Sequence, residues 1–248
     1  MKNIRTAFSI YTGNIEAVLF LSVVILTPFL AIHQWVASIC YYIGAFYGNP
    51  LFGDFANSFL VVLFLTICQL PFARFTLAEM EDEENRMKKS FVLFIKYGFS
   101  TFLFGILFSL GTFFGLFAFI LPGVAIMIFF YLTPIVMAIK DQPARKSWKP
   151  AAALAKKHFF KLVLLLVAVT FIEIILGYLV NVGVAMITLN TLAITLSQML
   201  LTLLLFPLMT IIMTVYSKQW FDELYPFAPT VNHREANTAP PKKVGFIQ

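Results

Sequence analysis

The sequence predicts an all-α protein, a polytopic transmembrane helix bundle of about six spans with a cytoplasmic interfacial amphipathic helix. Two observations support this prediction. The chain of 248 residues is 60% hydrophobic and only 12% charged, whereas soluble domains carry roughly 25% charged residues. In addition, all 18 Lys and Arg residues can be placed on one side of a membrane, and basic residues mark the cytoplasmic side.

Six stretches are apolar enough to cross a bilayer as helices of about 20 residues. They cover residues 15–37, 57–78, 97–121, 123–140, 162–187 and 191–215. An even number of crossings places both termini in the cytoplasm. Residues 1–225 are therefore predicted to form one integral membrane domain. Residues 226–248 are rich in Pro, Asn and Lys and are predicted to form a disordered cytoplasmic tail.

The outer connections differ in length. Residues 38–56 are predicted to form the long outer loop, because they combine glycines with aromatic residues typical of a membrane interface. Alternatively, the first span continues as a helix past Cys40 and breaks at Gly48. The other two outer connections are turns at Pro122–Gly123 and near residues 188–190. They predict tight antiparallel hairpins for the third and fourth spans and for the fifth and sixth.

Prolines and small residues recur within the spans. Each span that returns to the cytoplasm carries a proline, namely Pro71, Pro134 and Pro207. Three related helical hairpins would explain this recurrence, and so would chance, because proline is common in membrane helices. Gly111 and Gly115 have the spacing that lets helices approach closely. They predict packing within the bundle, with homo-oligomerisation as the alternative.

Residues 143–161 form the clearest amphipathic segment. An apolar stripe at helical spacing consists of Ala144, Trp148, Ala151, Ala155 and Phe159. Such a helix is expected to lie in the headgroup plane with its apolar face toward the lipid. It either sets the topology or provides a binding surface for anionic lipid headgroups or a membrane protein partner. The candidate lipid- or partner-binding surface consists of Arg145, Lys146, Trp148, Lys149, Lys156 and Lys157.

An acidic segment, residues 79–84, precedes a basic one. The pairs Asp82–Arg86 and Glu84–Lys88 have the i,i+4 spacing that stabilises a helix surface. The segment is therefore expected to be a solvated helical connector. The alternative is that it docks on the basic face of residues 143–161.

Glu173 lies near the middle of the fifth span. A carboxylate at the bilayer midplane costs a few kcal/mol, so it should face the bundle interior or a partner. It is either a proton-linked or substrate-contacting group or a protonated clamp between helices. Counting residues from the span ends gives a candidate midplane polar layer of Glu173, Gln69, Thr133, Thr202, Asn181 and Gln198.

Several function classes are not expected. The basic residues flank apolar spans, so anionic lipid is the expected partner and nucleic acid is not. Cys40 and Cys68 have no ligand-like spacing, and His33 stands alone near the outer end of the first span. No catalytic, cofactor-binding or metal-ligating set of residues is recognised in the sequence. We therefore expect no enzymatic activity and no cofactor.

A stretch of about 40 residues resembles a known family. It contains residues 121–123 (LPG), 132–136 (LTPIV), 144–148 (ARKSW) and 157–162 (KHFFKL). This order resembles the YciC-like bacterial membrane proteins and the membrane domain attached to some glycerophosphodiester phosphodiesterases. The resemblance implies an outer turn, a helix with a Pro-Val step and an amphipathic segment before the next span. It implies no phosphodiesterase activity, because the chain has no such catalytic domain.

These observations predict a multi-pass protein of a bacterial cytoplasmic membrane. The expected function is that of a non-catalytic accessory or scaffold subunit in membrane or envelope homeostasis. The alternative is a small transporter or channel that uses the polar layer around Glu173.

Overall fold

The computed structural model describes residues 2–49 and 51–226. Within these ranges the chain forms nine helices and no strand. The helices are α1 (Lys2–Gly13), α2 (Ile15–Phe46), α3 (Leu51–Met80), α4 (Arg86–Ala118), α5 (Ile120–Phe130), α6 (Thr133–Lys140), α7 (Ala144–Lys157), α8 (Phe159–Ile187) and α9 (Thr191–Leu224). The tail predicted from residue 226 onward lies outside the described residues, apart from Pro226.

Six helical segments in the described part are long and apolar enough to cross a membrane. They are α2, α3, α4, α8, α9 and the segment Ile120–Lys140, which contains α5 and α6. The prediction of an all-α polytopic bundle with six spans is therefore confirmed. Most of the helices extend several residues beyond the predicted spans, because polar and aromatic residues at a span end continue the helix outside the apolar window.

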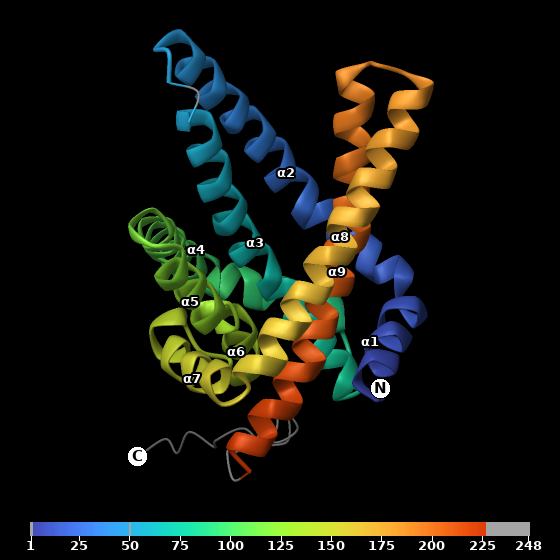
Figure 1. The fold of residues 1–248 in the computed structure, drawn as a ribbon. Coiled ribbons are helices and arrows are strands. Elements are labelled where there is room, and N and C mark those ends of the chain that lie inside the picture. The colour runs from blue at the N-terminus through green and yellow to red at the C-terminus, as the bar shows by residue number, and fades with distance from the viewer. Residues whose placement is uncertain (1, 50, 227–248) are drawn as a thin grey trace, which may run out of the picture.

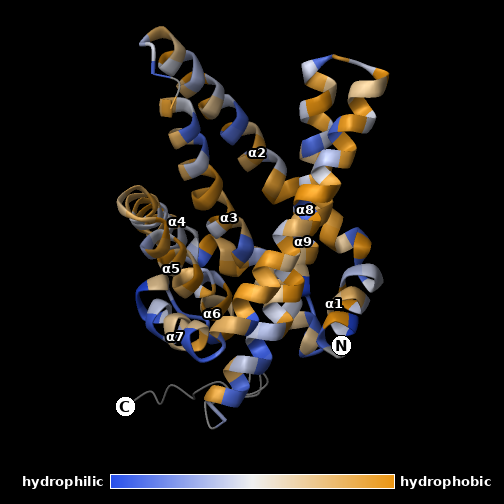
Figure 2. Cartoon of the chain, in the orientation of Figure 1, coloured by the Kyte–Doolittle hydropathy of each residue, from blue (hydrophilic) through white to orange (hydrophobic). Residues whose placement is uncertain are grey.

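Two long hairpins diverge from a shared base (Figure 1). The α2–α3 hairpin and the α8–α9 hairpin separate toward their turns, and we call this side of the bundle the far end. The α4–α5 hairpin, α6 and α7 lie around the base together with α1. The base carries the basic residues that flank the spans, such as Arg74 and Lys218, so we call it the basic end. Hydrophilic residues gather there around α7 and the adjoining part of α9 (Figure 2).

The buried core lies toward the basic end. One cluster joins α3, α6, α7 and α9 through fully buried side chains such as Leu70, Ile135 and Met213. A second cluster joins α1, α2, α3 and α9 around Leu21 and Phe72. By contrast, the only buried residue of α8 is Leu162, near its first turn. In a membrane, lipid would therefore cover most of α8, while protein covers the base.

The predicted outer loop at residues 38–56 is wrong, and the alternative with a continued first helix is confirmed. α2 runs to Phe46 and α3 begins at Leu51. Among the described residues of this segment, 38–49 and 51–56, only Gly48, with φ +66°, has the left-handed conformation that favours glycine. A Cβ on Gly53 would lie 2.1 Å from the ring of Tyr41. Gly53 therefore allows α3 to pack closely against Tyr41 of α2, although the sequence pattern suggested a loop.

The break between α4 and α5 lies at Phe119, not at the predicted Pro122–Gly123 turn. Phe119 has extended backbone angles, φ −159° and ψ 142°. Pro122 falls in the first turn of α5, where its missing N–H costs no helical hydrogen bond. Gly123 lies against α4, because a Cβ on Gly115 would be 2.7 Å from the Cα of Gly123. The small residues Gly111 and Gly115 thus serve packing within this chain, as expected.

One helix was not predicted. The sequence predicted no helix ahead of the first span at residues 15–37, but Lys2–Gly13 form α1, which packs along α9. Ala7 and Ile10 are buried there, and the hydroxyl of Tyr11 donates to the carbonyl oxygen of Leu204 at 3.1 Å. Because Lys2 and Arg5 interrupt the apolar residues, hydropathy alone does not mark this segment.

Candidate functional site

The described residues contain two candidate sites, the outer face of α7 and a cavity between the hairpins. α7 is fixed at its start by α4. Lys96 Nζ lies 2.9 Å from Asp141 Oδ1, in the turn before α7. The hydroxyl of Tyr97 donates to the Asp141 carbonyl oxygen at 2.6 Å, and the backbone N–H of Ala144 donates to Ser100 Oγ at 3.1 Å. Three contacts from one helix thus set the position of α7.

The apolar face of α7 is buried in the protein. Its buried residues are Ala144, Ser147, Ala151, Leu154 and Ala155, and the four apolar ones belong to the core cluster with α6 and α9. The expectation that the apolar stripe lies toward lipid is therefore wrong for Ala144, Ala151 and Ala155, whereas Trp148 of the same stripe is exposed. The predicted helix also ends earlier, at Lys157, so that Phe159 belongs to α8. The amphipathic pattern was predicted correctly, but such a pattern cannot distinguish burial in lipid from burial against α6.

The opposite face of α7 is a cationic surface. Trp148 is 37% exposed, and its ring lies 5.4 Å from Lys149 Nζ and 6.0 Å from the ring of Phe130. All five cations are exposed, and none forms an ion pair with a described residue. We call these residues the α7 cationic surface: Arg145, Lys146, Trp148, Lys149, Lys156 and Lys157.

The acidic segment at residues 79–84 does not dock on α7 in this structure. Glu83 pairs with Arg74 at 2.5 Å and Lys89 at 3.3 Å, and Arg86 pairs with Glu79. The predicted pair of Asp82 with Arg86 is present at 3.7 Å, but the ion pairs of the described residues do not include Glu84 with Lys88. The expected helical connector is wrong, because α3 ends at Met80, α4 begins at Arg86, and Asp82 between them has a left-handed backbone conformation. Because Glu79, Glu81 and Glu83 pair with cations on α3, α4 and α9, this acidic segment does not occupy the α7 cationic surface.

His158 joins the end of α7 to α9. Its ring stacks on that of Trp220, with centroids 4.9 Å apart and planes at 6°. Burial lowers the pKa of His158 below its usual range, nearby Lys161 and Lys157 lower it further, and Glu223 opposes them. The folded chain therefore favours the neutral imidazole.

We expect this histidine to make stability depend on pH. The unfolded chain, with a His pKa of about 6.5, binds the proton more readily than the folded chain. The free energy of unfolding should therefore fall as pH drops through 6.5 toward the lower folded pKa. In His158→Phe, which retains an aromatic stack, the fall between pH 8 and pH 5.5 should be smaller. Chemical unfolding in detergent at both pH values measures it, and an equal fall in both proteins would contradict the expectation.

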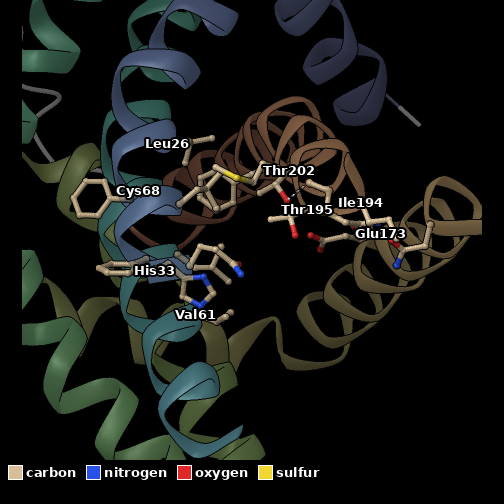
Figure 3. A pocket seen from close by; sticks show the side chains of 17 residues that line it. Leu26, His33, Val61, Cys68, Glu173, Ile194, Thr195 and Thr202 are labelled. Carbon is tan, nitrogen blue, oxygen red and sulfur yellow. Dashed lines mark hydrogen bonds between the residues drawn. The ribbon is translucent and has the colours of Figure 1, made fainter. Parts of the chain in front are cut away.

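The second candidate site is a cavity of about 450 Å³ between the two diverging hairpins. α2, α3, α8 and α9 line it, and Figure 3 shows Glu173 and Thr195 on one side with His33 across from them. Apolar side chains, including Phe29, Phe64 and Phe206, form much of its wall. The polar residues that line it are His33, Gln34, Glu173, Asn181, Thr195, Gln198 and Thr202.

The structure brings together four of the six residues of the predicted polar layer. Glu173, Asn181, Gln198 and Thr202 line the cavity. Gln69 and Thr133 do not line it, and they are buried in α3 and at the start of α6. Counting residues from span ends gives the depth of a side chain but not the direction in which it points. Depth alone therefore could not separate these two from the others.

Three polar residues of the cavity were missed by sequence reasoning. His33 and Gln34 come from α2, and Thr195 comes from α9. His33 looked like an isolated interfacial residue, yet its Nε2 atom is buried and has no hydrogen-bond partner in the described part of the chain. The signal that could have found it is its position inside the predicted span 15–37, where a polar ring needs a polar partner.

The polar groups of α8 and α9 are only partly satisfied. Nε2 of Gln198 donates to the carbonyl oxygen of Gly177 at 3.0 Å, and Oγ1 of Thr202 donates to the Gln198 carbonyl oxygen at 3.0 Å. The carboxylate of Glu173 and the amide of Asn181 form no hydrogen bond or ion pair with a described residue. The cavity thus offers hydrogen-bonding groups without partners inside an otherwise apolar wall.

The fold and these two sites define the class of the protein as a multi-pass integral membrane protein. No family model, curated protein or solved structure matches the chain. Among the described residues, no group of three His, Cys, Asp or Glu side chains is placed to hold a metal ion.

Proposed function

We propose that this chain is a non-catalytic accessory or scaffold protein of a bacterial cytoplasmic membrane, which engages anionic lipid headgroups through the α7 cationic surface. One observation carries the proposal: five exposed cations, which form no ion pair with any described residue, lie on a helix whose other face is fixed in the protein core. The role in membrane or envelope homeostasis follows from such headgroup binding.

The energetics favour headgroup binding at this surface. Each Lys or Arg near an anionic membrane surface contributes about 1 kcal/mol. Arg74, Lys96 and Lys218 flank spans and already supply the positive charge that orients the protein in the membrane. The cations on α7 exceed what this orientation requires. Trp148 adds an amphipathic ring of the kind enriched at membrane interfaces. The positive-inside rule places this basic end, with both termini, on the cytoplasmic side.

Charge reversal tests this role. In the variant Arg145→Glu/Lys149→Glu/Lys156→Glu, the co-purifying anionic phospholipid should fall severalfold, because three attractive charges become repulsive. Lipid extraction and mass spectrometry of protein purified from native membranes measure it. The control Arg5→Glu/Lys88→Glu/Lys161→Glu reverses three other exposed cations and should retain more of the lipid. Equal lipid content in both variants contradicts the proposal, and loss of a co-purifying protein instead assigns the surface to a protein partner.

A second candidate function is transport or conduction through the polar layer around Glu173. The observation that favours it is the cavity, because it brings this carboxylate and three more predicted polar residues into one space. Flux in proteoliposomes that Glu173→Gln abolishes would favour transport, whereas an inactive wild-type protein would exclude it for the solutes tested.

We also propose membership of the YciC-like family, on the strength of residues 121–162. The segments that carry the resemblance fall on α5, α6 and α7 and on the start of α8. They include Pro134 at the start of α6 and Ser147 on the buried face of α7. The resemblance thus concerns residues that position the α7 cationic surface.

A further inference from the structure

The carboxylate of Glu173 has no cation to neutralise it. α8 spans Phe159–Ile187. Glu173 is its central residue and lies midway between its two ends. No Lys or Arg lines the cavity. A charged side chain at this depth is costly unless it is paired or faces a cavity. Glu173 lines the cavity, so an occupant of that space can supply the cation that the described residues do not.

The cavity has the form and chemistry of a small-molecule site. Its volume of about 450 Å³ falls in the range of roughly 300–1,000 Å³ that ligand pockets occupy. Its wall is mainly apolar and contains three phenylalanines, Phe29, Phe64 and Phe206. Aromatic rings attract cations as well as apolar chains. An occupant with an apolar body and a cationic group would match both the wall and the carboxylate.

Acceptor atoms for such a cationic group are present on α8 and α9. Because Nε2 of Gln198 is engaged with Gly177, its Oε1 atom remains available to accept a hydrogen bond. Thr195 also lines the cavity, and Figure 3 shows its side chain on the same side as Glu173. An ammonium group donates three hydrogen bonds and accepts none, and this set of oxygens can receive them. His33 is the one lining residue whose side chain can itself become a cation. It lies across the cavity from Glu173 (Figure 3).

The cavity is accessible from the bilayer. Val61 and Leu65 are 37% and 38% exposed, and Gln34 and Glu173 are also exposed. All of these residues lie on membrane-spanning helices. An amphiphile dissolved in the bilayer can therefore enter between α2–α3 and α8–α9 without passing through the protein core.

We propose that the cavity binds an amphiphilic primary amine, with its ammonium group on Glu173 and its apolar chain along the phenylalanine-lined wall. An anionic amphiphile is disfavoured because it would face a carboxylate with no lysine or arginine nearby. A neutral amphiphile would leave that carboxylate without a counter-ion. This inference rests on the cavity that also supports the transport alternative, and it is independent of the α7 cationic surface.

The test measures saturable binding of dodecylamine, dodecanol and dodecanoate to the full chain in phosphatidylcholine nanodiscs, using radiolabelled ligands. The three probes share a chain length and differ in charge. We expect wild-type protein to bind dodecylamine at least tenfold more tightly than dodecanol and to show no saturable binding of dodecanoate. Equal affinity for dodecylamine and dodecanol would overturn the proposal, because charge would then contribute nothing.

Two pairs of variants locate the site. Glu173→Gln, which preserves size, should weaken dodecylamine binding at least tenfold, whereas Glu16→Gln, at an exposed acid outside the cavity, should not. Val61→Trp should fill the cavity and block binding, whereas Val92→Trp, at an exposed valine of α4, should not. Unchanged dodecylamine binding in Glu173→Gln or in Val61→Trp overturns the proposal.

The result is separable from that for the α7 cationic surface. The Arg145→Glu/Lys149→Glu/Lys156→Glu variant should retain dodecylamine binding, because these residues do not line the cavity. Conversely, Glu173→Gln should retain its co-purifying anionic lipid. Loss of amine binding in the α7 variant would contradict the assignment of the amine to the cavity.

Discussion

Glu83→Gln is expected to lower the free energy of unfolding by about 3–5 kcal/mol, the usual cost of removing one partner from a buried ion pair. Arg74 is only 8% exposed, and its Nη2 atom lies 2.5 Å from Glu83 Oε2. Without the carboxylate, the guanidinium would remain buried beside the core with no counter-ion. Lys89, 3.3 Å from the same carboxylate oxygen, would lose its partner as well.

Unfolding in mixed detergent micelles, followed by circular dichroism, measures this difference. Asp82→Asn is the matched control, because the Asp82 side chain is 93% exposed and pairs with Arg86 at 3.7 Å. Exposed pairs of this kind contribute about 0–1 kcal/mol. Asparagine also tolerates the φ of +50° at this position. Similar losses in Glu83→Gln and Asp82→Asn would show that burial of the Arg74 pair does not determine stability.

Gly115→Ala is expected to destabilise the chain by about 3 kcal/mol, at the upper end of the usual cost of overpacking. The new Cβ would lie 2.7 Å from the Cα and 2.8 Å from the N of Gly123. Both are backbone atoms, so no side chain can rotate to make room. The α4–α5 hairpin would have to separate, and the packing of α5 and α6 beneath it would weaken.

The matched control is Gly98→Ala in the same helix. Nothing lies within 4 Å of a Cβ built on Gly98, so alanine should stabilise α4 by about 0.5–1 kcal/mol through its helix propensity. The two substitutions should therefore shift the unfolding midpoint in opposite directions. A shift of the same sign in both would contradict the close approach of α4 and α5.

The fold could be predicted because the bilayer imposes a simple rule on the sequence. Apolar stretches of about 20 residues and one-sided basic charge determine six spans and their order. The errors occurred where local signals had two physical meanings. Gly53 was taken to indicate a loop but allows contact with Tyr41, and α1 was missed because Arg5 breaks its apolar run while Ala7 and Ile10 are buried by α9.

The candidate sites could be predicted only in part. Periodicity identified the α7 cations, since a helix places them on one face whatever its surroundings. The burial of Leu154 and Ala155 against the protein could not be predicted, because it depends on where α6 and α9 lie. Depth counting gave Glu173 and its neighbours on α8 and α9. It missed His33 because a cavity also depends on the direction in which α2 diverges from α9.

The sparse burial of α8 has a consequence for how the molecule responds to its surroundings. Since Leu162 is its only buried residue, few contacts within the chain hold α8 at a given angle to α2–α3, whereas α9 is packed at the base against α2 and α3. The tilt of a membrane helix depends on the match between its apolar length and the thickness of the bilayer. The thickness of the bilayer therefore helps to set the angle between the two hairpins. A change in that thickness would widen or narrow the space around Glu173.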